Sequence, residues 1–164
     1  MSTNERKLFD DAVSAIYRND LKKLLEIIEN GFNITQKDKD GRTILFYAVL
    51  DDNGTIVEFL SKNKANLNER DILGWSPLHY SAQNYFVDIA RTLITYGANL
   101  ENRDNYGNTP LSRATFASQG RGDMIRLLLN SGADPHNKNG SGVSPLDLAN
   151  TIANYDVKQF YNEQ

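Results

Sequence analysis

Apolar residues recur along the chain at helical spacing, in short segments separated by turn-forming residues. Spacings of three and four positions place the apolar side chains of such a segment on one face of a helix. One segment contains Ile89, Leu93 and Ile94, and another contains Leu21, Leu24, Ile27 and Ile28. The helical spacing predicts that these segments are helices.

The helical segments belong to a unit that repeats along the chain. Gly41, Gly74, Gly107 and Gly142 set its frame, at intervals of 33, 33 and 35 residues. Each glycine is followed by a similar phrase, in 42–48, 75–81, 108–114 and 143–149, and each unit ends with a second phrase, in 30–33, 63–66, 96–99 and 131–134. A period of this length is typical of a solenoid, in which each unit buries its apolar face against its neighbours.

Each part of the phrase has a physical reason, which the unit around Gly74 illustrates. The glycine permits a turn conformation that other residues resist. Ser76 can cap the following helix, and Pro77 suits the first helical position. The later pair Gly97 and Ala98 is typical of a left-handed helix end.

These residues resemble the ankyrin-repeat family, whose unit includes Thr-Pro-Leu-His and a closing Leu-Leu…Gly-Ala-Asp. The best match is Ser76-Pro77-Leu78-His79, which is followed by Gly97-Ala98-Asn99. The resemblance implies an all-α solenoid, in which each unit is a β-turn finger followed by two antiparallel helices and the units stack into a curved array. It divides one domain, 1–164, into about five units: a cap at 4–36, then 37–69, 70–102 and 103–136, and a cap at 137–164. Because the end units look like caps with a solvated face, we expect a complete array.

The chain departs from the family pattern at several positions. The second unit has Ile44 where proline is usual and Phe46 where histidine is usual. Lys64 replaces its closing glycine, so we expect a less regular helix end there. Two extra residues around 118–122 predict a longer loop between the helices of the fourth unit.

Composition narrows the classes of function. The chain carries 18 basic and 21 acidic residues, for a formal net charge of −3, and 40% of its residues are hydrophobic. The charge argues against a nucleic-acid partner, which normally requires a concentrated basic stripe. The chain has no cysteine, which excludes disulfides and thiolate chemistry. With no signal-like or membrane-spanning stretch, we expect a cytoplasmic protein without a membrane partner.

Candidate catalytic residues are few. His79 stands at the family's histidine position, where it is expected to hydrogen-bond neighbouring backbone, and His136 follows Pro135 in a turn. The glycine-rich stretch 139–142 lacks the lysine of a phosphate loop. Asp38, Asp71 and Asp104 recur once per unit, about 10 Å apart by helix-packing distances, too far to share a metal ion. They are expected to stabilise turns. We therefore expect neither catalysis nor a bound cofactor or metal.

The family implies that a protein partner meets the concave face, formed by the finger tips and the outward side of the first helices. Arg70, Arg103 and Lys138 are expected to solvate the edge of the array rather than to grip phosphate. By register the partner-binding candidates are Lys39, Asp40, Arg42, Leu50, Asp51, Ile72, Leu73, Trp75, Gln83, Asn84, Tyr85, Asn105, Tyr106, Asn108 and Phe116.

Trp75, the only tryptophan, is the most informative candidate. Tryptophan is enriched among interface hot spots because it buries a large area with little rotamer loss. Adjoining Ile72 and Leu73 favour this interpretation, since solvent-facing apolar clusters usually serve binding. The alternative is packing against the neighbouring finger, on Tyr106 or Arg42. For Tyr85 and Phe86, one of the two is expected to fill the core between helices.

The predicted function is a stoichiometric binder or inhibitor of one protein, acting as a monomer. Its small size and mild acidity suggest a narrower version, an immunity protein that neutralises a basic toxin. The alternative is an adaptor that joins two proteins. An enzyme or small-molecule binder is disfavoured, since no polar groups converge in the sequence pattern.

Overall fold

Residues 3–162 are described by a computed structural model of the chain. Over these residues the chain forms nine α-helices and one 3₁₀ helix, with no strand, which confirms the predicted all-α fold. The predicted unit boundaries stay a prediction, and residues 1–2 and 163–164 of the predicted domain lie outside the described part. The helices are α1 (Thr3–Tyr17), α2 (Leu21–Glu29), α3 (Ile44–Leu50), α4 (Gly54–Lys62), α5 (Pro77–Asn84), α6 (Val87–Thr95), α7 (Pro110–Phe116), α8 (Asp123–Asn130), α9 (Pro145–Thr151) and η1 (Val157–Tyr161).

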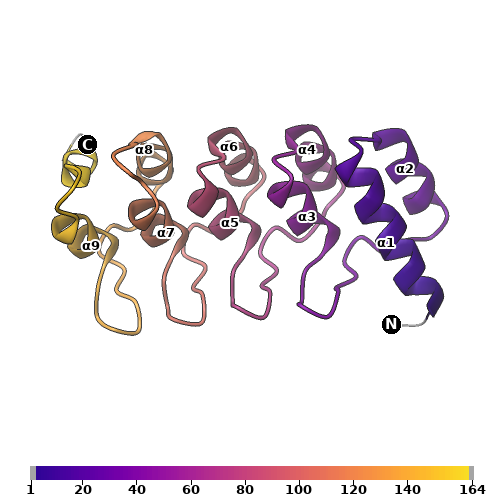
Figure 1. The fold of residues 1–164 in the computed structure, drawn as a ribbon, viewed down its shortest axis with the longest axis horizontal. Helices are drawn as coiled ribbons and strands as arrows, with labels where there is room; N and C mark the ends of the chain where they lie inside the picture. The colour runs from indigo at the N-terminus through magenta and orange to yellow at the C-terminus, as the bar shows by residue number, and fades with distance from the viewer. Residues whose placement is uncertain (1–2, 163–164) are drawn as a thin grey trace.

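The helices stand in two rows, with long loops projecting from one of them. Figure 1 shows α1, α3, α5, α7 and α9 in the row beside the loops and α2, α4, α6 and α8 in the other. The two ends of the chain lie at opposite ends of the rows (Figure 1). Each helix packs mainly on its partner in the pair and on its neighbours in the row, as in a repeat solenoid.

The core lies between the two rows and between successive pairs. Leu45, Leu78 and Leu111 occupy the same place in three units and are fully buried. Ala48 and Ala114 are buried a little further along their helices, where a small side chain lets neighbouring helices approach. The leucine and alanine of the repeated phrase therefore face the stack.

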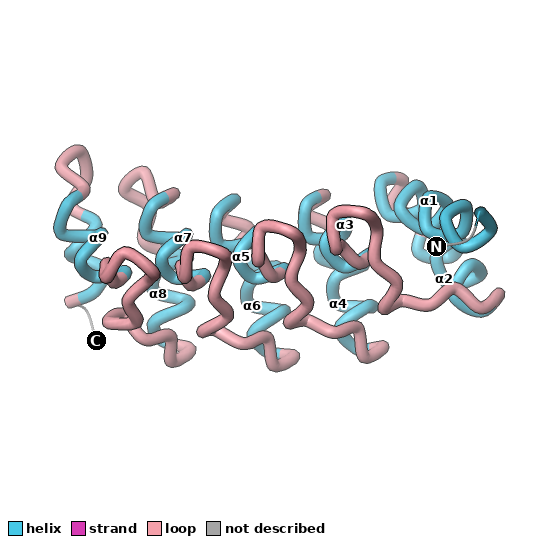
Figure 2. The backbone as a smooth tube through the Cα atoms, turned by 90° about the horizontal axis from the view of Figure 1, so that it is seen from below, coloured by secondary structure: helices cyan, strands magenta, loops and turns pink. Residues whose placement is uncertain are grey.

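The projecting loops end in four tight turns, which we call finger 1 (38–42), finger 2 (71–75), finger 3 (104–108) and finger 4 (139–143). In each finger the N–H of the first residue donates to the carbonyl of the last, at 2.9 to 3.0 Å. Neighbouring fingers are joined by single backbone hydrogen bonds, from Ile72 to Asp40, Asn105 to Leu73 and Gly140 to Tyr106, at 2.9, 3.1 and 2.9 Å. The fingers therefore form a continuous layer beside the helices (Figure 2).

The helix ends show which sequence departures matter. Ile44 begins α3 at the place where proline begins α5, α7 and α9. The end of α4, expected to be less regular, keeps its turn but has one backbone hydrogen bond fewer. Lys64 adopts the left-handed conformation with φ 62°, and the N–H of Ala65 donates to the Leu60 carbonyl at 3.0 Å. The N–H groups of Gly31, Gly97 and Gly132 each donate to the carbonyl three residues earlier, and that of Lys64 does not. The longer loop predicted in the fourth unit is confirmed, since 117–122 separate α7 from α8 whereas only 85–86 separate α5 from α6.

Candidate partner-binding site

A carboxylate fixes each of the first three fingers from inside. In finger 2, Oδ1 of the buried Asp71 accepts the N–H groups of Leu73 and Trp75 at 2.9 and 3.0 Å. Its Oδ2 accepts the hydroxyl of Tyr80, nine residues further along, at 2.6 Å. We call this pair of contacts the finger lock. Finger 1 repeats it with Asp38 and Tyr47 at 2.6 Å, and finger 3 repeats it with Asp104 and the Nε of Arg113 at 3.1 Å.

The finger locks leave little free charge on this face. Burial and the hydrogen bond to Asp71 raise the pKa of Tyr80 to about 12, so its hydroxyl remains a donor. Burial alone would raise the pKa of Asp104, but the Arg113 guanidinium and the finger amides hold it below its ordinary value. Asp71 pairs with Arg42 and Asp104 with Arg113, so both carboxylates are neutralised within the chain.

Four side chains stack across the bases of fingers 1 to 3. The Arg42 guanidinium lies 5.3 Å from the Tyr80 ring centre and donates to its hydroxyl at 2.7 Å. The Tyr80 and Trp75 rings lie 4.8 Å apart, and the Arg113 guanidinium lies 4.3 Å above the Trp75 ring. We call Arg42, Tyr80, Trp75 and Arg113 the ladder. Contacts of this kind contribute about 0.5–2 kcal/mol each.

The ladder explains why an aromatic residue stands at position 75. Trp75 is half-buried, and its ring partners are Tyr80, Arg113 and His79, the last at 6.2 Å. It packs within the chain, as the alternative held, but the partners expected for it, Tyr106 and Arg42, were wrong. Its contribution to partner binding stays a prediction.

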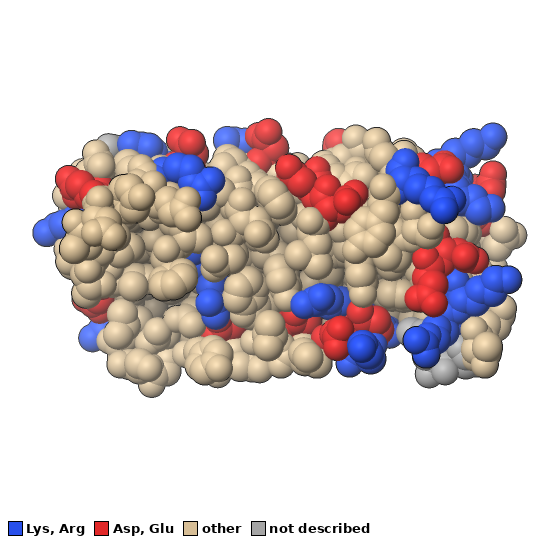
Figure 3. Space-filling view, in the orientation of Figure 1, with Lys and Arg blue, Asp and Glu red and all other residues tan. Residues whose placement is uncertain are grey.

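The finger tips and the end of α7 carry exposed apolar side chains. Ile72 and Leu73 are 62% and 48% exposed, Tyr106 is 74% exposed, and Phe116 is 68% exposed. The remaining tip candidates, Lys39 and Asn105, are also exposed, and Asp40 is half-buried. Figure 3 shows charged side chains gathered near α1 and finger 1, whereas fingers 2 to 4 are almost without charge in this view. The exposed apolar tips therefore lie in the less charged half of the face.

The candidates at the ends of the first helices have different environments. Tyr85 is half-buried; its hydroxyl donates to the carbonyls of Arg121 and Ala114 at 2.8 and 3.1 Å, and the Arg121 guanidinium lies 4.0 Å from its ring centre. Burial raises its pKa. Tyr85 therefore holds the loop 117–122 in place. Both Tyr85 and Phe86 are half-buried against the core.

The other helix-end candidates are less constrained. Leu50 is half-buried and Asp51 is exposed. The amide of Asn84 donates to the Tyr80 carbonyl at 2.9 Å, so it serves α5 itself. The amide oxygen of Gln83 is buried without a hydrogen-bond partner. No hydrogen bond within the described residues accounts for this oxygen.

His79 has a structural role, as expected. Its Nδ1 accepts the Ser76 N–H at 3.1 Å, which leaves Nε2 to donate to the Asn108 carbonyl at 3.0 Å. The ring therefore joins α5 to finger 3 in its neutral form. Burial lowers its pKa to about 4. His136 is exposed, in the turn expected for it.

Arg70, Arg103 and Lys138 are exposed, as expected of residues that solvate the edge, and the two arginines also make hydrogen bonds within the chain. Arg70 donates to the carbonyl of Gly74 at 3.1 Å within its own finger loop. Arg103 donates to the Asn137 side chain at 3.0 Å and to the Lys138 carbonyl. Arg103 thus bridges two neighbouring finger loops.

Two grooves lie at opposite ends of the finger face. The N-groove, of about 500 Å³, is lined by Arg6, Phe9, Asp10, Lys37, Asp38, Lys39, Asp40 and Tyr47. The C-groove, of about 380 Å³, is lined by Asn108, Ser112, Arg113, Phe116, Asn139, Ser141, Val143, Ser144 and Leu148. The first is rich in charge of both signs, whereas the second is mainly apolar and hydroxyl-lined.

Neither a metal cluster nor a membrane span is found in the described part of the chain. Residues 3–162 contain no group of three or more histidine or acidic side chains placed to hold a metal ion. No helix among them is long and apolar enough to cross a bilayer.

Sequence reasoning missed Tyr80, Arg113 and Leu148, which determine the surface between the fingers. A signal was present in the spacing, because each of these residues stands nine positions after the first residue of its finger. The candidates chosen from the sequence were residues at the finger tips and helix ends, and Tyr80, Arg113 and Leu148 lie between these two sets.

Known proteins share the repeat in sequence. A family model described as ankyrin repeats in three copies matches residues 12–104 and again 52–139. The tyrosine-protein kinase Shark of Drosophila melanogaster is 33% identical over 148 residues. An ankyrin repeat protein of Rickettsia bellii is 29% identical over 118 residues, and the Notch-regulated ankyrin repeat-containing protein of Homo sapiens is 33% identical over 91.

The extent of these matches differs. The Shark alignment covers 89% of this chain but 16% of the kinase. The Rickettsia alignment covers 71% of this chain and 64% of the Rickettsia protein. The alignment with the Notch-regulated protein covers 55% of this chain and 80% of that protein. The chain thus spans less than two thirds of the first two relatives.

Proposed function

Because the chain belongs to the ankyrin-repeat family, whose repeats mediate protein–protein interaction, we propose that it is a non-catalytic, monomeric binder of one partner protein. The partner meets the finger face in 1:1 stoichiometry. The observation that carries this proposal is the set of exposed apolar side chains on fingers 2 and 3, which fold stability does not require. Ile72 and Tyr106 are 62% and 74% exposed, and large apolar residues at such positions usually mark interaction sites.

The test is affinity capture from the native source followed by a binding measurement with the captured protein. The double variant Ile72→Asp/Tyr106→Asp places two charges on the tips without touching the core. We expect it to weaken binding by more than a hundredfold, since the loss of a hot-spot aromatic and the burial of an unpaired carboxylate each cost several kcal/mol. A Trp75 variant would be less clear, because it also breaks the ladder.

A matched control carries the same substitutions on the opposite row of helices. Leu25 in α2 and Tyr96 after α6 are each 37% exposed. The variant Leu25→Asp/Tyr96→Asp changes net charge equally and should bind like the wild type. If the control loses binding and the finger variant keeps it, the partner uses the outer helices and this proposal is wrong.

The narrower version, inhibition of a basic toxin in the manner of an immunity protein, is carried by the net charge of −3. Salt distinguishes it from binding through apolar contacts. A basic partner held by charge loses affinity steeply between 50 and 500 mM NaCl, conditions that span Debye lengths of roughly 14 to 4 Å. An affinity that changes by less than threefold would contradict the basic-toxin version and leave the binder intact.

The adaptor alternative differs in stoichiometry. An adaptor forms a ternary complex with two captured proteins at once, whereas a binder of one partner forms only a binary complex. Light scattering on the purified complex measures this directly.

A further inference from the structure

The ladder follows a rule that relates successive units. The last residue of finger 1, Arg42, stacks on Tyr80, the residue that closes the lock of finger 2. The last residue of finger 2, Trp75, stacks with Arg113, which closes the lock of finger 3. In both places a planar side chain fills the space between one finger and the next finger-side helix.

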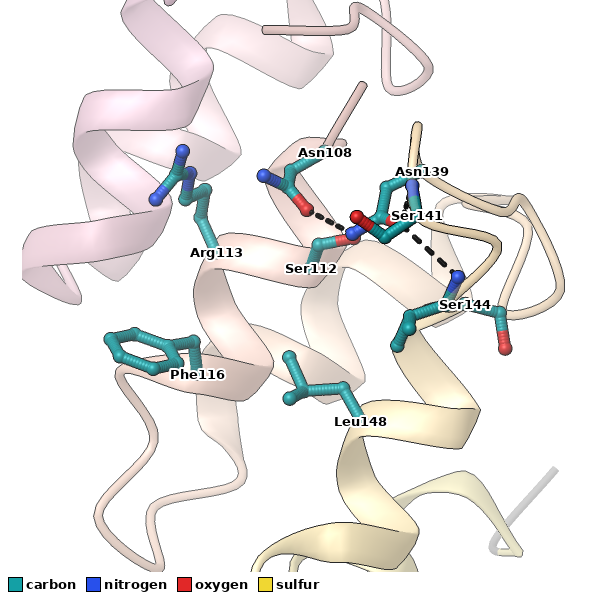
Figure 4. A pocket seen from close by; sticks show the side chains of 9 residues that line it. Asn108, Ser112, Arg113, Phe116, Asn139, Ser141, Ser144 and Leu148 are labelled. Atoms are coloured by element: carbon teal, nitrogen blue, oxygen red, sulfur yellow. Dashed lines mark hydrogen bonds between the residues drawn. The ribbon is translucent and has the colours of Figure 1, made fainter. Parts of the chain in front are cut away.

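The third such place is not filled. The corresponding residues are Asn108, the last of finger 3, and Leu148, nine positions after the start of finger 4. Both line the C-groove, and neither reaches across it. Figure 4 shows Leu148 extending from α9 toward α7, with Phe116 at the end of α7 and Asn108 on the finger side. The C-groove therefore lies where a further rung of the ladder would stand.

The amide and guanidinium side chains of the C-groove are already bonded within the chain. Asn139 replaces the lock carboxylate; its Nδ2 donates to Oδ1 of Asn108 at 2.8 Å, and its Oδ1 accepts the N–H of Ser141 and of Val143 at 2.9 and 3.1 Å. The charged lining residue, Arg113, pairs with Asp104. A charged occupant would find no free counter-charge in the groove and would lose its hydration.

The apolar part of the lining is formed by Phe116, Val143 and Leu148. Phe116 is 68% exposed, so a large part of its ring is open to an incoming group. An aromatic ring pairs favourably with another at the offset or edge-on geometries that an exposed ring permits. The volume of about 380 Å³ lies in the range of roughly 300–1,000 Å³ that holds small ligands.

We propose that the C-groove binds one uncharged aromatic side chain of the partner protein, which completes the ladder in the fourth interval. This inference rests on the proposed function, because it names the chemistry by which the finger face recognises its partner. The complementarity is that of a neutral, mainly apolar groove for a neutral ring. A partner that docks on the exposed tips of fingers 2 and 3 would place such a residue next to them.

The test uses a small probe, N-acetyl-tryptophanamide, and does not require the partner. It is titrated into ¹⁵N-labelled protein while amide shifts are followed by NMR. We expect saturable shifts centred on Ser112, Phe116, Val143 and Leu148, with a dissociation constant on the order of millimolar, as befits a small fragment. N-acetyl-leucinamide and N-acetyl-argininamide should bind at least fivefold more weakly.

A variant that fills the groove gives the decisive comparison. Asn139→Asp with Leu148→Arg introduces in finger 4 the pair that Asp104 and Arg113 form in finger 3. We expect it to weaken the probe at least tenfold. The matched control Leu25→Arg, on α2 and away from the groove, should bind the probe unchanged. Phe116→Ala removes an exposed ring, leaves the core intact, and should weaken the probe at least threefold even if the double variant folds poorly.

Several results would overturn the inference. Shifts that do not saturate, that centre elsewhere, or that persist in both groove variants would show that the C-groove is not the site. Equal or tighter binding of the leucine or arginine probe would show that the occupant is not aromatic. If the probe fails while the captured partner is still lost with the finger-tip variant, only this inference fails. If the probe binds but no 1:1 partner exists, the proposed function fails instead.

Discussion

Finger 2 and finger 4 have the same backbone turn but differ in what lies beneath it. Gly74 and Gly142 adopt φ values of 76° and 77°, and the first side chain of each finger accepts two backbone N–H groups. Beneath finger 2, Asp71 joins Tyr80 and Arg42 in a packed, charge-neutral cluster. Beneath finger 4, the side-chain nitrogen of the corresponding Asn139 donates to the side chain of Asn108, with no charged or aromatic partner beside it, and a groove opens.

The difference shows that the turn and the surface between turns are specified separately. The turn needs a glycine and an acceptor, and Asn139 supplies the acceptor as well as Asp71 does. The surface depends on the residue nine positions later, which is Tyr80 in one unit and Leu148 in the other. Units of one scaffold can therefore present either a closed ladder or an open groove without changing their backbone.

Removing the first side chain of each finger should give the largest difference in stability between finger 2 and finger 4. Asp71→Ala leaves two part-buried N–H groups, the Tyr80 hydroxyl and the Arg42 guanidinium without their acceptor. We expect a loss of about 3 kcal/mol in the free energy of unfolding. Asn139 is half-buried beside the exposed residues 140–143, where water can replace its amide, so we expect Asn139→Ala to cost about 1 kcal/mol. Urea unfolding with an unchanged slope measures both. Equal losses would show that the lock adds nothing to the turn.

The start of α5 is capped by Ser76 with His79, and the start of α9 by Ser144 with Asp147. As the pH falls, the first cap should weaken before the second. Folding lowers the pKa of His79 from 6.5 to about 4, so above pH 6.5 its contribution to stability is complete. As the pH falls from 6.5 toward 4, His79 becomes protonated in the unfolded chain but stays neutral in the folded one. The free energy of unfolding therefore drops by about 3 kcal/mol. The Ser144 amide lowers the pKa of Asp147 at the corresponding place in α9, so that contribution is lost only below its ordinary value of 3.8.

Urea unfolding at several pH values checks this, with His79→Ser as the comparison, since Ser112 occupies the same place in α7. The variant should be less stable at pH 7 and nearly independent of pH between 6.5 and 4.5. A wild type that is equally flat in this window would contradict a neutral buried imidazole.

Alanine at the finger glycines should distinguish crowded from open turns. Both glycines have positive φ, so either substitution costs about 1 kcal/mol of backbone strain. A Cβ at Gly74 would also lie 2.7 Å from the Asn105 nitrogen, whereas one at Gly142 meets nothing within 4 Å. We expect Gly74→Ala to lower the free energy of unfolding by about 2 kcal/mol more than Gly142→Ala. Thermal unfolding measures both variants. A difference below 0.5 kcal/mol would mean that finger 2 shifts enough to accommodate the added Cβ without a loss of stability.

Much of the fold could be predicted from the sequence because each repeated residue has one local task. The glycines, the Ser and Thr before each first helix, and the leucine and alanine of the stack each act within a few residues of their position. Lys64 shows the limit even here. A non-glycine residue was expected to disturb the helix end. Lys64 lacks the backbone hydrogen bond that the closing glycines make, yet the left-handed conformation and the bond from Ala65 to Leu60 remain.

The candidate site was less accessible to sequence reasoning because its contacts join residues of different units. Trp75 could be singled out by rarity, but its partner Arg113 lies in the next unit and follows from no local rule. The C-groove arises from two short side chains, Asn108 and Leu148, at places where other units have long ones. Such a space becomes visible only when units are compared position by position in three dimensions.

Building a lock in finger 4 should give the smallest effect and the sharpest test of the comparison. Asn139→Asp alone places a carboxylate without a counter-charge beneath the finger, and Leu148→Arg alone removes apolar contact, so each should cost about 0.5–1 kcal/mol. Together they recreate the contact of Asp104 with Arg113. We expect a favourable coupling of about 1 kcal/mol in a double-mutant cycle of urea unfolding, because the two residues come into direct contact. Strict additivity would show that nine-residue spacing does not itself form a lock, and that Tyr80 and Arg113 depend on ladder neighbours that finger 4 lacks.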